Sequence, residues 1–150
     1  MARWADLCTA EPAFAQRVRR AFDVARHKTI ATVRRDGSPR ISGIEVEFAH
    51  GDVWIGTMSD AVKARDLRRD PRLALHSPTV DPPPDDPGAW EGEAKLAGSV
   101  SGPSDSSSAT PRRFTIDLTE VVLTRIGAPA DHLVIESWHP GRGLERVERR

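Results

Sequence analysis

Three residues whose side chains can bind an anion lie close together near the middle of the chain: Thr57, Ser59 and Lys63. The apolar residues 53–57 indicate a strand, and residues 61–70 indicate a short helix. A turn from a strand into a helix presents free backbone N–H groups at the positive end of the helix dipole, which favours a phosphate. The sequence therefore predicts an anion site made of two hydroxyls, the helix N–H groups and the Lys63 ammonium.

Lys63 is unusual for its position, because a cation in the first helical turn is disfavoured by about 0.3–1 kcal/mol. A bound anion would remove this conflict. Alternatively, Asp60 neutralises Lys63 and the helix is a solvent-exposed connector. Either Ser59 or Asp60 is predicted to cap the helix.

The bulk composition excludes several classes of protein. Lys plus Arg and Asp plus Glu number 22 each, so the net charge of zero argues against non-specific nucleic-acid binding and polybasic membrane binding. The single cysteine, Cys8, excludes an internal disulfide framework and a cysteine-based zinc cluster. The five histidines are not spaced as metal ligands, so we expect no metal site. No apolar run approaches the ~20 residues of a membrane span, and we expect a cytoplasmic protein.

The remaining elements are mostly strands. Residues 9–12 indicate the start of an amphipathic helix, with Thr9 as its cap and Pro12 in its first turn. Residues 29–33 and 39–48 alternate as two strands around an Asp36-Gly37 hairpin turn. Later strands are expected at the following residues: 53–57, 73–75, 93–100, 114–123 and 133–135.

Two segments are expected to be irregular: the Pro-rich residues 78–88 and the Ser-rich residues 101–110. Residues 145–150 are expected to be a charged terminal segment. The sum predicts one mainly β, antiparallel domain over residues 1–150, with about seven short strands closing into a small barrel, an N-terminal helix and one inserted helix.

The order of these elements resembles the pyridoxamine 5′-phosphate oxidase-like proteins, which share the FMN-binding split β-barrel. The resemblance is carried by Pro-Arg-Ile-Ser-Gly at 39–43, Val-Trp-Ile-Gly-Thr at 53–57, Lys63 six residues after Thr57, and the segment 67–75. The Asp-Pro-Arg step at 70–72 looks most like the actinobacterial branch that uses the deazaflavin coenzyme F420 as well as, or in place of, FMN.

The resemblance implies a homodimer with two cofactors at the subunit interface, and it implies roles for particular residues. Lys63 would hold the cofactor phosphate. Trp138 would cross to the partner's site or be an ordinary aromatic at the barrel end. The residues flanking the ring or the ribityl chain would be Arg40, Ile41 and Ser42, and those lining the ring would be Trp54, Ile55, Gly56 and Thr57.

Two functions follow as hypotheses. The first is a flavin- or deazaflavin-dependent oxidoreductase that transfers hydride to or from a small molecule; the cofactor supplies the chemistry, which explains the lack of a catalytic side-chain motif. The second is a dimer that binds or sequesters FMN, F420 or haem without turnover. A degenerate barrel with an empty site is a weaker third. Because the two irregular segments depart from the family, its pyridoxine-phosphate substrate is not carried over.

Overall fold

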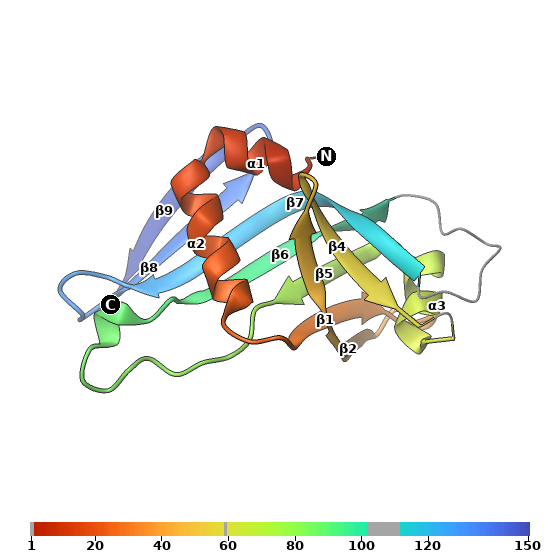
Figure 1. Ribbon diagram of the computed structural model, residues 1–150, viewed down its shortest axis with the longest axis horizontal. Helices are drawn as coiled ribbons and strands as arrows, with labels where there is room; N and C mark the ends of the chain where they lie inside the picture. Colours follow the sequence, from red (N-terminus) through yellow and green to blue (C-terminus); the bar gives the residue numbers. More distant parts are fainter. Residues whose placement is uncertain (1, 59, 102–111) are drawn as a thin grey trace.

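The computed structural model of the chain describes residues 2–58, 60–101 and 112–150. Ser59 and residues 102–111 lie outside this description, and with them most of the predicted Ser-rich linker. The helices are α1 (Trp4–Ala10), α2 (Pro12–Asp23), α3 (Val62–Arg69) and the short 3₁₀ helix η1 (Pro87–Ala89). The strands are β1 (Lys28–Val33), β2 (Pro39–Ile44), β3 (Val46–Ala49), β4 (Asp52–Thr57), β5 (Arg72–His76), β6 (Glu93–Ser101), β7 (Arg112–Ile126), β8 (Leu133–His139) and β9 (Gly143–Arg149) (Figure 1).

Within the described residues, the strands form one antiparallel sheet in the order β2-β1-β5-β6-β7-β4-β3. The two end strands, β2 and β3, are separated only by Glu45, and β2 also contacts β4. The sheet therefore curls round on itself. Strands β8 and β9 extend the sheet beyond this curled part. Strand β8 pairs with the second half of β7, and β9 pairs with β8.

Strand β7 belongs to both parts of the sheet, and it changes phase between them. Phe114, Ile116 and Leu118 point into the core, but after the register shift opposite Ala97 and Gly98 the buried residues become Val121 and Leu123. Gly98 is needed at this point, because a Cβ there would collide with the carbonyl oxygen of Asp117.

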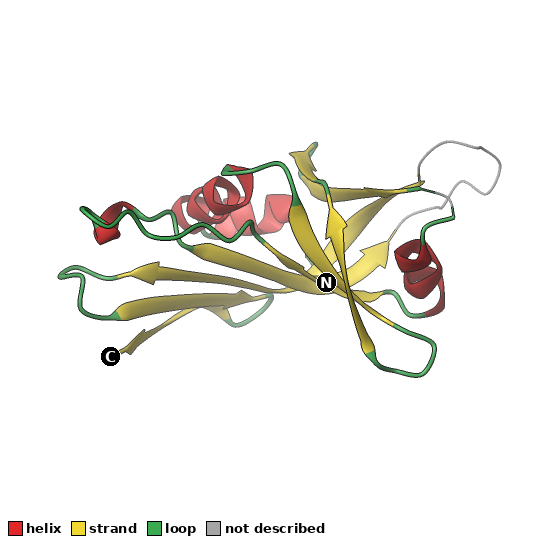
Figure 2. Ribbon diagram, turned by 90° about the horizontal axis from the view of Figure 1, so that it is seen from below, coloured by secondary structure: helices red, strands yellow, loops and turns green. Residues whose placement is uncertain are grey.

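Helices α1 and α2 cover one face of the sheet (Figure 2). Their apolar side chains are fully buried, including Leu7, Phe14 and Phe22. Trp4 and Phe22 both meet the ring of Phe48 on β3 edge-on, with centroid distances of 4.7 and 5.6 Å. This contact joins the helices to the edge of the barrel.

The mainly β, antiparallel architecture is confirmed, and several element predictions are corrected. The predicted strand 39–48 is two strands, because the chain leaves β2 at Ile44 and enters β3 at Val46. The charged end is strand β9, which raises the total within the described residues to nine. Two helices replace the single N-terminal one: Thr9 lies inside α1, and Glu11 precedes α2 without a side-chain cap.

None of the helices in the described part of the chain combines the length and apolar character needed to cross a membrane. In that part, too, no three side chains of His, Cys, Asp or Glu come together as a metal site.

Candidate functional site

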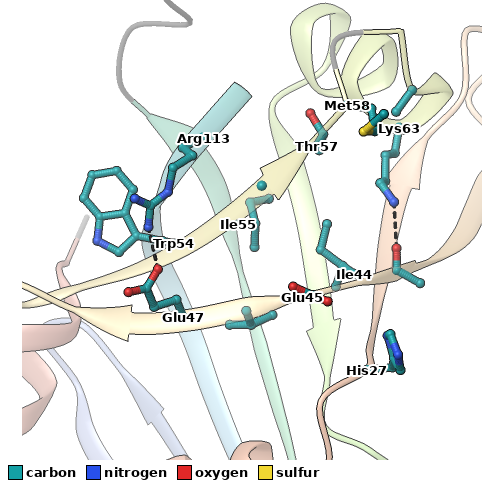
Figure 3. A pocket seen from close by; sticks show the side chains of 14 residues that line it. His27, Ile44, Glu45, Glu47, Trp54, Ile55, Thr57, Met58, Lys63 and Arg113 are labelled. Atoms are coloured by element: carbon teal, nitrogen blue, oxygen red, sulfur yellow. Dashed lines mark hydrogen bonds and ion pairs between the residues drawn. The ribbon is translucent and has the colours of Figure 1, made fainter. Parts of the chain in front are cut away.

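A groove of about 630 Å³ lies between the N-terminus of α3 and the outer surface of strands β3 and β4. This volume falls in the range of small-molecule sites. Figure 3 shows two charged ends. Lys63 and Thr57 lie at the α3 end, and Arg113, Trp54 and Glu47 lie at the other end. The groove thus provides a cationic side chain at each end.

At the α3 end, Lys63 bridges the groove. Its ammonium donates to the backbone carbonyl of Gly43 on β2, with an N···O distance of 2.7 Å. In the part of the chain that the structure describes, this carbonyl is the partner of Lys63, and Asp60 makes no ion pair with it. The helix begins later than predicted: its N-cap is Ala61, which has no side-chain acceptor, so neither Ser59 nor Asp60 is in the capping position.

Thr57 is the last residue of β4, and its side chain is only 3% exposed. Its hydroxyl oxygen is buried and has no hydrogen-bond partner among the residues that the structure describes. A buried hydroxyl without a partner costs free energy. Thr57 is among the residues that line the groove, so a ligand oxygen that reached this hydroxyl would satisfy it.

The position of α3 is fixed by Asp66, whose side chain is 2% exposed. Asp66 accepts hydrogen bonds at 2.8 Å from Thr32 on β1, Arg40 on β2 and Arg69 on α3. Burial alone would raise the pKa of Asp66, but the hydrogen bonds from Arg40, Thr32 and Arg69 together outweigh it, and the pKa is lowered. The ionised carboxylate therefore clamps the helix to the β1–β2 hairpin.

At the other end, the Arg113 guanidinium lies over the indole of Trp54, 4.8 Å from the ring centroid. Arg113 also forms an ion pair with Glu47 at 2.6 Å. The indole N–H of Trp54 donates to the carbonyl of Ala49 at 3.0 Å, which fixes the ring. Gly56 follows Trp54 on the same face of β4 and has no side chain to fill the groove.

The predicted site residues fall into two groups. The groove is lined by Trp54, Ile55, Gly56, Thr57 and Lys63. The others lie elsewhere, and Ser59 is outside the described residues. Arg40 forms an ion pair with Asp66, Ile41 is 75% exposed on β2, and Ser42 follows Ile41 on the same strand. None of these three residues lines the groove. Trp138 is 5% exposed and belongs to the hydrophobic core.

Sequence reasoning missed Arg113, Glu47, His27 and Met58, which all line the groove. Arg113 comes next to the Ser-rich segment, and it reaches the groove because β7 pairs with β4, where Arg113 lies opposite Gly56. No local sequence pattern indicates that β7 pairs with β4, because the two strands are far apart in the sequence.

The groove fits a phosphate-bearing ligand at its α3 end. The unpartnered Thr57 hydroxyl, an ammonium whose present partner is uncharged, and a helix terminus without a side-chain cap are all groups that a phosphate satisfies. The outer face of β4 next to them has an aromatic ring and an open glycine position.

The fold has counterparts among solved structures. No protein-family model matches the sequence, and no curated protein is similar to it in sequence. A pyridoxamine 5′-phosphate oxidase-related, FMN-binding protein from Nostoc punctiforme matches over 97% of this chain and 99% of its own, with a TM-score of 0.68 and 11% identity.

Two further structures have different functions in their names. An F420 reductase matches over 68% of this chain and 93% of its own, with a TM-score of 0.53 and 15% identity. The haem-storage protein HutZ from Vibrio cholerae matches over 76% and 94%, with a TM-score of 0.56 and 13% identity. This chain therefore has the split-barrel fold of the pyridoxamine 5′-phosphate oxidase-like proteins, a fold shared by proteins named for FMN, F420 and haem.

Proposed function

We propose that this protein is an oxidoreductase that binds FMN or coenzyme F420 in the groove, with the cofactor phosphate at Thr57 and Lys63. The observation that carries the proposal is that Thr57 and Lys63 both line the groove, and that the buried hydroxyl of Thr57 has no hydrogen-bond partner among the described residues. A protein that did not use this hydroxyl would gain stability by replacing it with a methyl group.

When bound, either cofactor would supply hydride transfer, and the protein would bind, orient and shield it. Lys63 and Thr57 would hold the phosphate by charge-assisted and hydroxyl hydrogen bonds. Trp54 offers an aromatic surface already fixed by its bond to Ala49. Met58 and Ile55 provide apolar lining that would limit water near a ring.

A second candidate function is storage or transport of a cofactor without turnover. The observation that favours it is His27, whose imidazole lines the groove and is of the type that binds haem iron. Reduction separates the two candidates, because a storage protein would hold a cofactor that neither a nicotinamide nor a reduced deazaflavin could reduce.

We also propose that the protein is a homodimer with the groove at the edge of its interface. The sheet face opposite α1 and α2 carries a row formed by Thr124 and the apolar residues Ile135 and Val147, which pair side by side on β7, β8 and β9. No described element covers this face in Figure 2. It continues along the outer side of β7 to Thr115, which pairs with Trp54 at the groove.

Charge supports a second copy as the occupant of this face. On the same face, the neighbouring row of paired residues runs across the strands from Lys95 through Val122 and Ser137 to Glu145. A two-fold axis parallel to the strands would bring Lys95 of each copy opposite Glu145 of the other. Such an isologous contact is self-complementary.

A titration tests the proposed cofactor site directly. Purified protein is titrated with FMN and with riboflavin, which lacks the phosphate, and ligand fluorescence is followed. We expect FMN to bind at least about tenfold more tightly, as for one charge-assisted contact. F420 is titrated in parallel. Equal affinity for FMN and riboflavin would reject the phosphate site, and no binding of any of the three would reject the proposed function.

Gly43 offers a steric test of the same groove. A Cβ at residue 43 meets no atom of the described residues within 4 Å, yet the residue lines the groove. Gly43→Leu should therefore fold normally and block the ligand, while Gly43→Ala should bind nearly as well as the wild type. If Gly43→Leu binds with wild-type affinity, the ligand site lies elsewhere.

A further inference from the structure

The ion pair between Arg113 and Glu47 stands at the end of the groove where the proposed function places the cofactor ring (Figure 3). Its N···O distance is 2.6 Å. Among the described residues that line the groove, Lys63 is the other lysine or arginine, and it lies at the α3 end. Arg113 is therefore the cation that a bound ring would meet.

Trp54 helps to fix the position of this cation. The Arg113 guanidinium carbon lies 4.8 Å from the indole centroid, and the indole N–H is bound to the carbonyl of Ala49 at 3.0 Å. A cation above an aromatic face is attracted to it. The guanidinium is thus held at the ring end from two sides, by the carboxylate of Glu47 and by the indole.

Reduction changes the charge of a ring at this place. A hydride carries one proton and two electrons, so a ring that accepts it gains one negative charge unless it also takes up a proton from water. A nearby cation stabilises the more negative form, and a nearby carboxylate destabilises it. Protein charges close to a cofactor ring are one of the means by which a protein adjusts its electronic properties.

We propose that the Arg113–Glu47 pair sets the reduction potential of the bound cofactor: Arg113 stabilises the reduced ring and raises the potential, and Glu47 limits this effect. The inference rests on the proposed function and gives a redox role to two residues outside the phosphate site. Their side chains are 54% and 62% exposed. We therefore expect the effect of a charge partly screened by solvent, which is smaller than that of a buried ion.

Variants of the two residues should shift the potential in opposite directions. Arg113→Gln should weaken binding of the reduced cofactor about three- to tenfold relative to the oxidised cofactor, which lowers the two-electron potential by about 14–30 mV. Glu47→Gln should have the reverse effect, within the same range. Arg113→Lys keeps the positive charge, so its potential should stay within about twofold of the wild type, or about 9 mV.

The experiment measures the midpoint potential of the bound cofactor in the wild type and each variant, by equilibration with a reference dye at low salt. FMN is used, or F420 if the wild type binds it more tightly, and a titration gives the Kd of the oxidised form. Higher salt should reduce the shifts. The matched control is Arg146→Gln, since Arg146 pairs with Glu148 on β9 at nearly the same exposure, 53% and 55%, and does not line the groove.

A purely structural role of Arg113 would give a different result. If Arg113→Gln only disturbs the groove, it weakens the oxidised and the reduced cofactor equally, and the potential keeps its wild-type value. That result, or shifts of the same sign in Arg113→Gln and Glu47→Gln, would overturn the inference and leave the phosphate site standing. If the wild type binds neither cofactor, the proposed function fails and takes this inference with it.

Discussion

The ammonium of Lys63 donates to the backbone carbonyl of Gly43, so the first turn of α3 is joined to strand β2 across the groove. A carbonyl satisfies one N–H group of the ammonium but leaves its charge uncompensated. Lys63 is therefore oriented by the protein and still able to attract an anion.

Removing this charge should affect ligand binding far more than folding. Lys63→Met keeps the length of the side chain and loses the ammonium. We expect the FMN Kd to rise by about tenfold or more, at least ~1.5 kcal/mol, and the free energy of unfolding to fall by less than about 1 kcal/mol. Arg65→Met is the control, because Arg65 is exposed on the same helix and does not line the groove. Equal FMN affinity in wild type and Lys63→Met would remove the basis for an anion site here.

Thr57→Val should separate stability from binding. Valine has nearly the same shape, and it removes a buried hydroxyl that has no partner. The ligand-free variant should be as stable as the wild type or up to about 1 kcal/mol more stable, while its FMN affinity falls about three- to tenfold. Urea unfolding and fluorescence titration give the two values.

Thr32 provides the matched comparison for Thr57. Its hydroxyl is also buried, but it donates to Asp66 at 2.8 Å. Thr32→Val should therefore lose about 1–2 kcal/mol of stability. If Thr57→Val is destabilised to the same extent, its hydroxyl has a structural partner and does not await a ligand.

Asp66 makes stability depend on acid pH. Its folded-state pKa lies below the unfolded value of about 3.9, so its contribution is fully present above that value and is lost as the pH falls through the folded pKa. Asp66→Asn should lower the free energy of unfolding at pH 7 by about 2–3 kcal/mol, because two arginines lose a charged partner.

The pH profile distinguishes this charge from a packing effect. The stability of Asp66→Asn should change less between about pH 5 and pH 2 than that of the wild type. The control Asp23→Asn should follow the wild-type profile, because the Asp23–Arg19 pair is exposed on α2. Parallel profiles for Asp66→Asn and wild type would show that the carboxylate does not clamp α3 through its charge.

The proposed dimer depends on the uncovered face of β7, β8 and β9. Ile135 lies between Thr124 and Val147 at the centre of the row, so Ile135→Lys should yield a monomer in sedimentation velocity at concentrations where the wild type is dimeric. Val24→Lys is the control, because Val24 is already 42% exposed beyond the end of α2. A wild type that stays monomeric at high concentration, or an Ile135→Lys dimer of unchanged affinity, would contradict this interface.

Much of the fold could be predicted because strand alternation and turn residues are local signals. The Asp36-Gly37 hairpin and the strand–helix–strand unit around α3 are found near the predicted positions, with Gly37 at φ 87°. The break at Glu45 was missed because the alternation of buried Ile44 and Phe48 continues through it, although one strand pairs with β1 and the other with β4.

Strand β9 and the far end of the groove depend on tertiary pairing, and this limited their prediction. Four of the seven residues of β9 are charged, so it lacks an apolar face, and it forms because β8 presents an edge. Similarly, Arg113 and Trp54 are brought together by the pairing of β7 with β4, whereas Thr57 and Lys63 are neighbours in the sequence. Local chemistry thus predicted one end of the groove and missed the other.

The register shift in β7 has a consequence for how this chain can change in length. Thr119 is the extra residue between Leu118, which pairs with Gly98, and Glu120, which pairs with Ala97. Deleting Thr119 would make β7 a regular strand, because Leu118, Glu120 and Val121 would then alternate and Val121 and Leu123 would still face the core. Deleting a residue within either half of β7 would instead turn the buried side chains on one side of the deletion to solvent. We therefore expect a one-residue deletion at Thr119 to be tolerated better than a one-residue deletion within either half of β7.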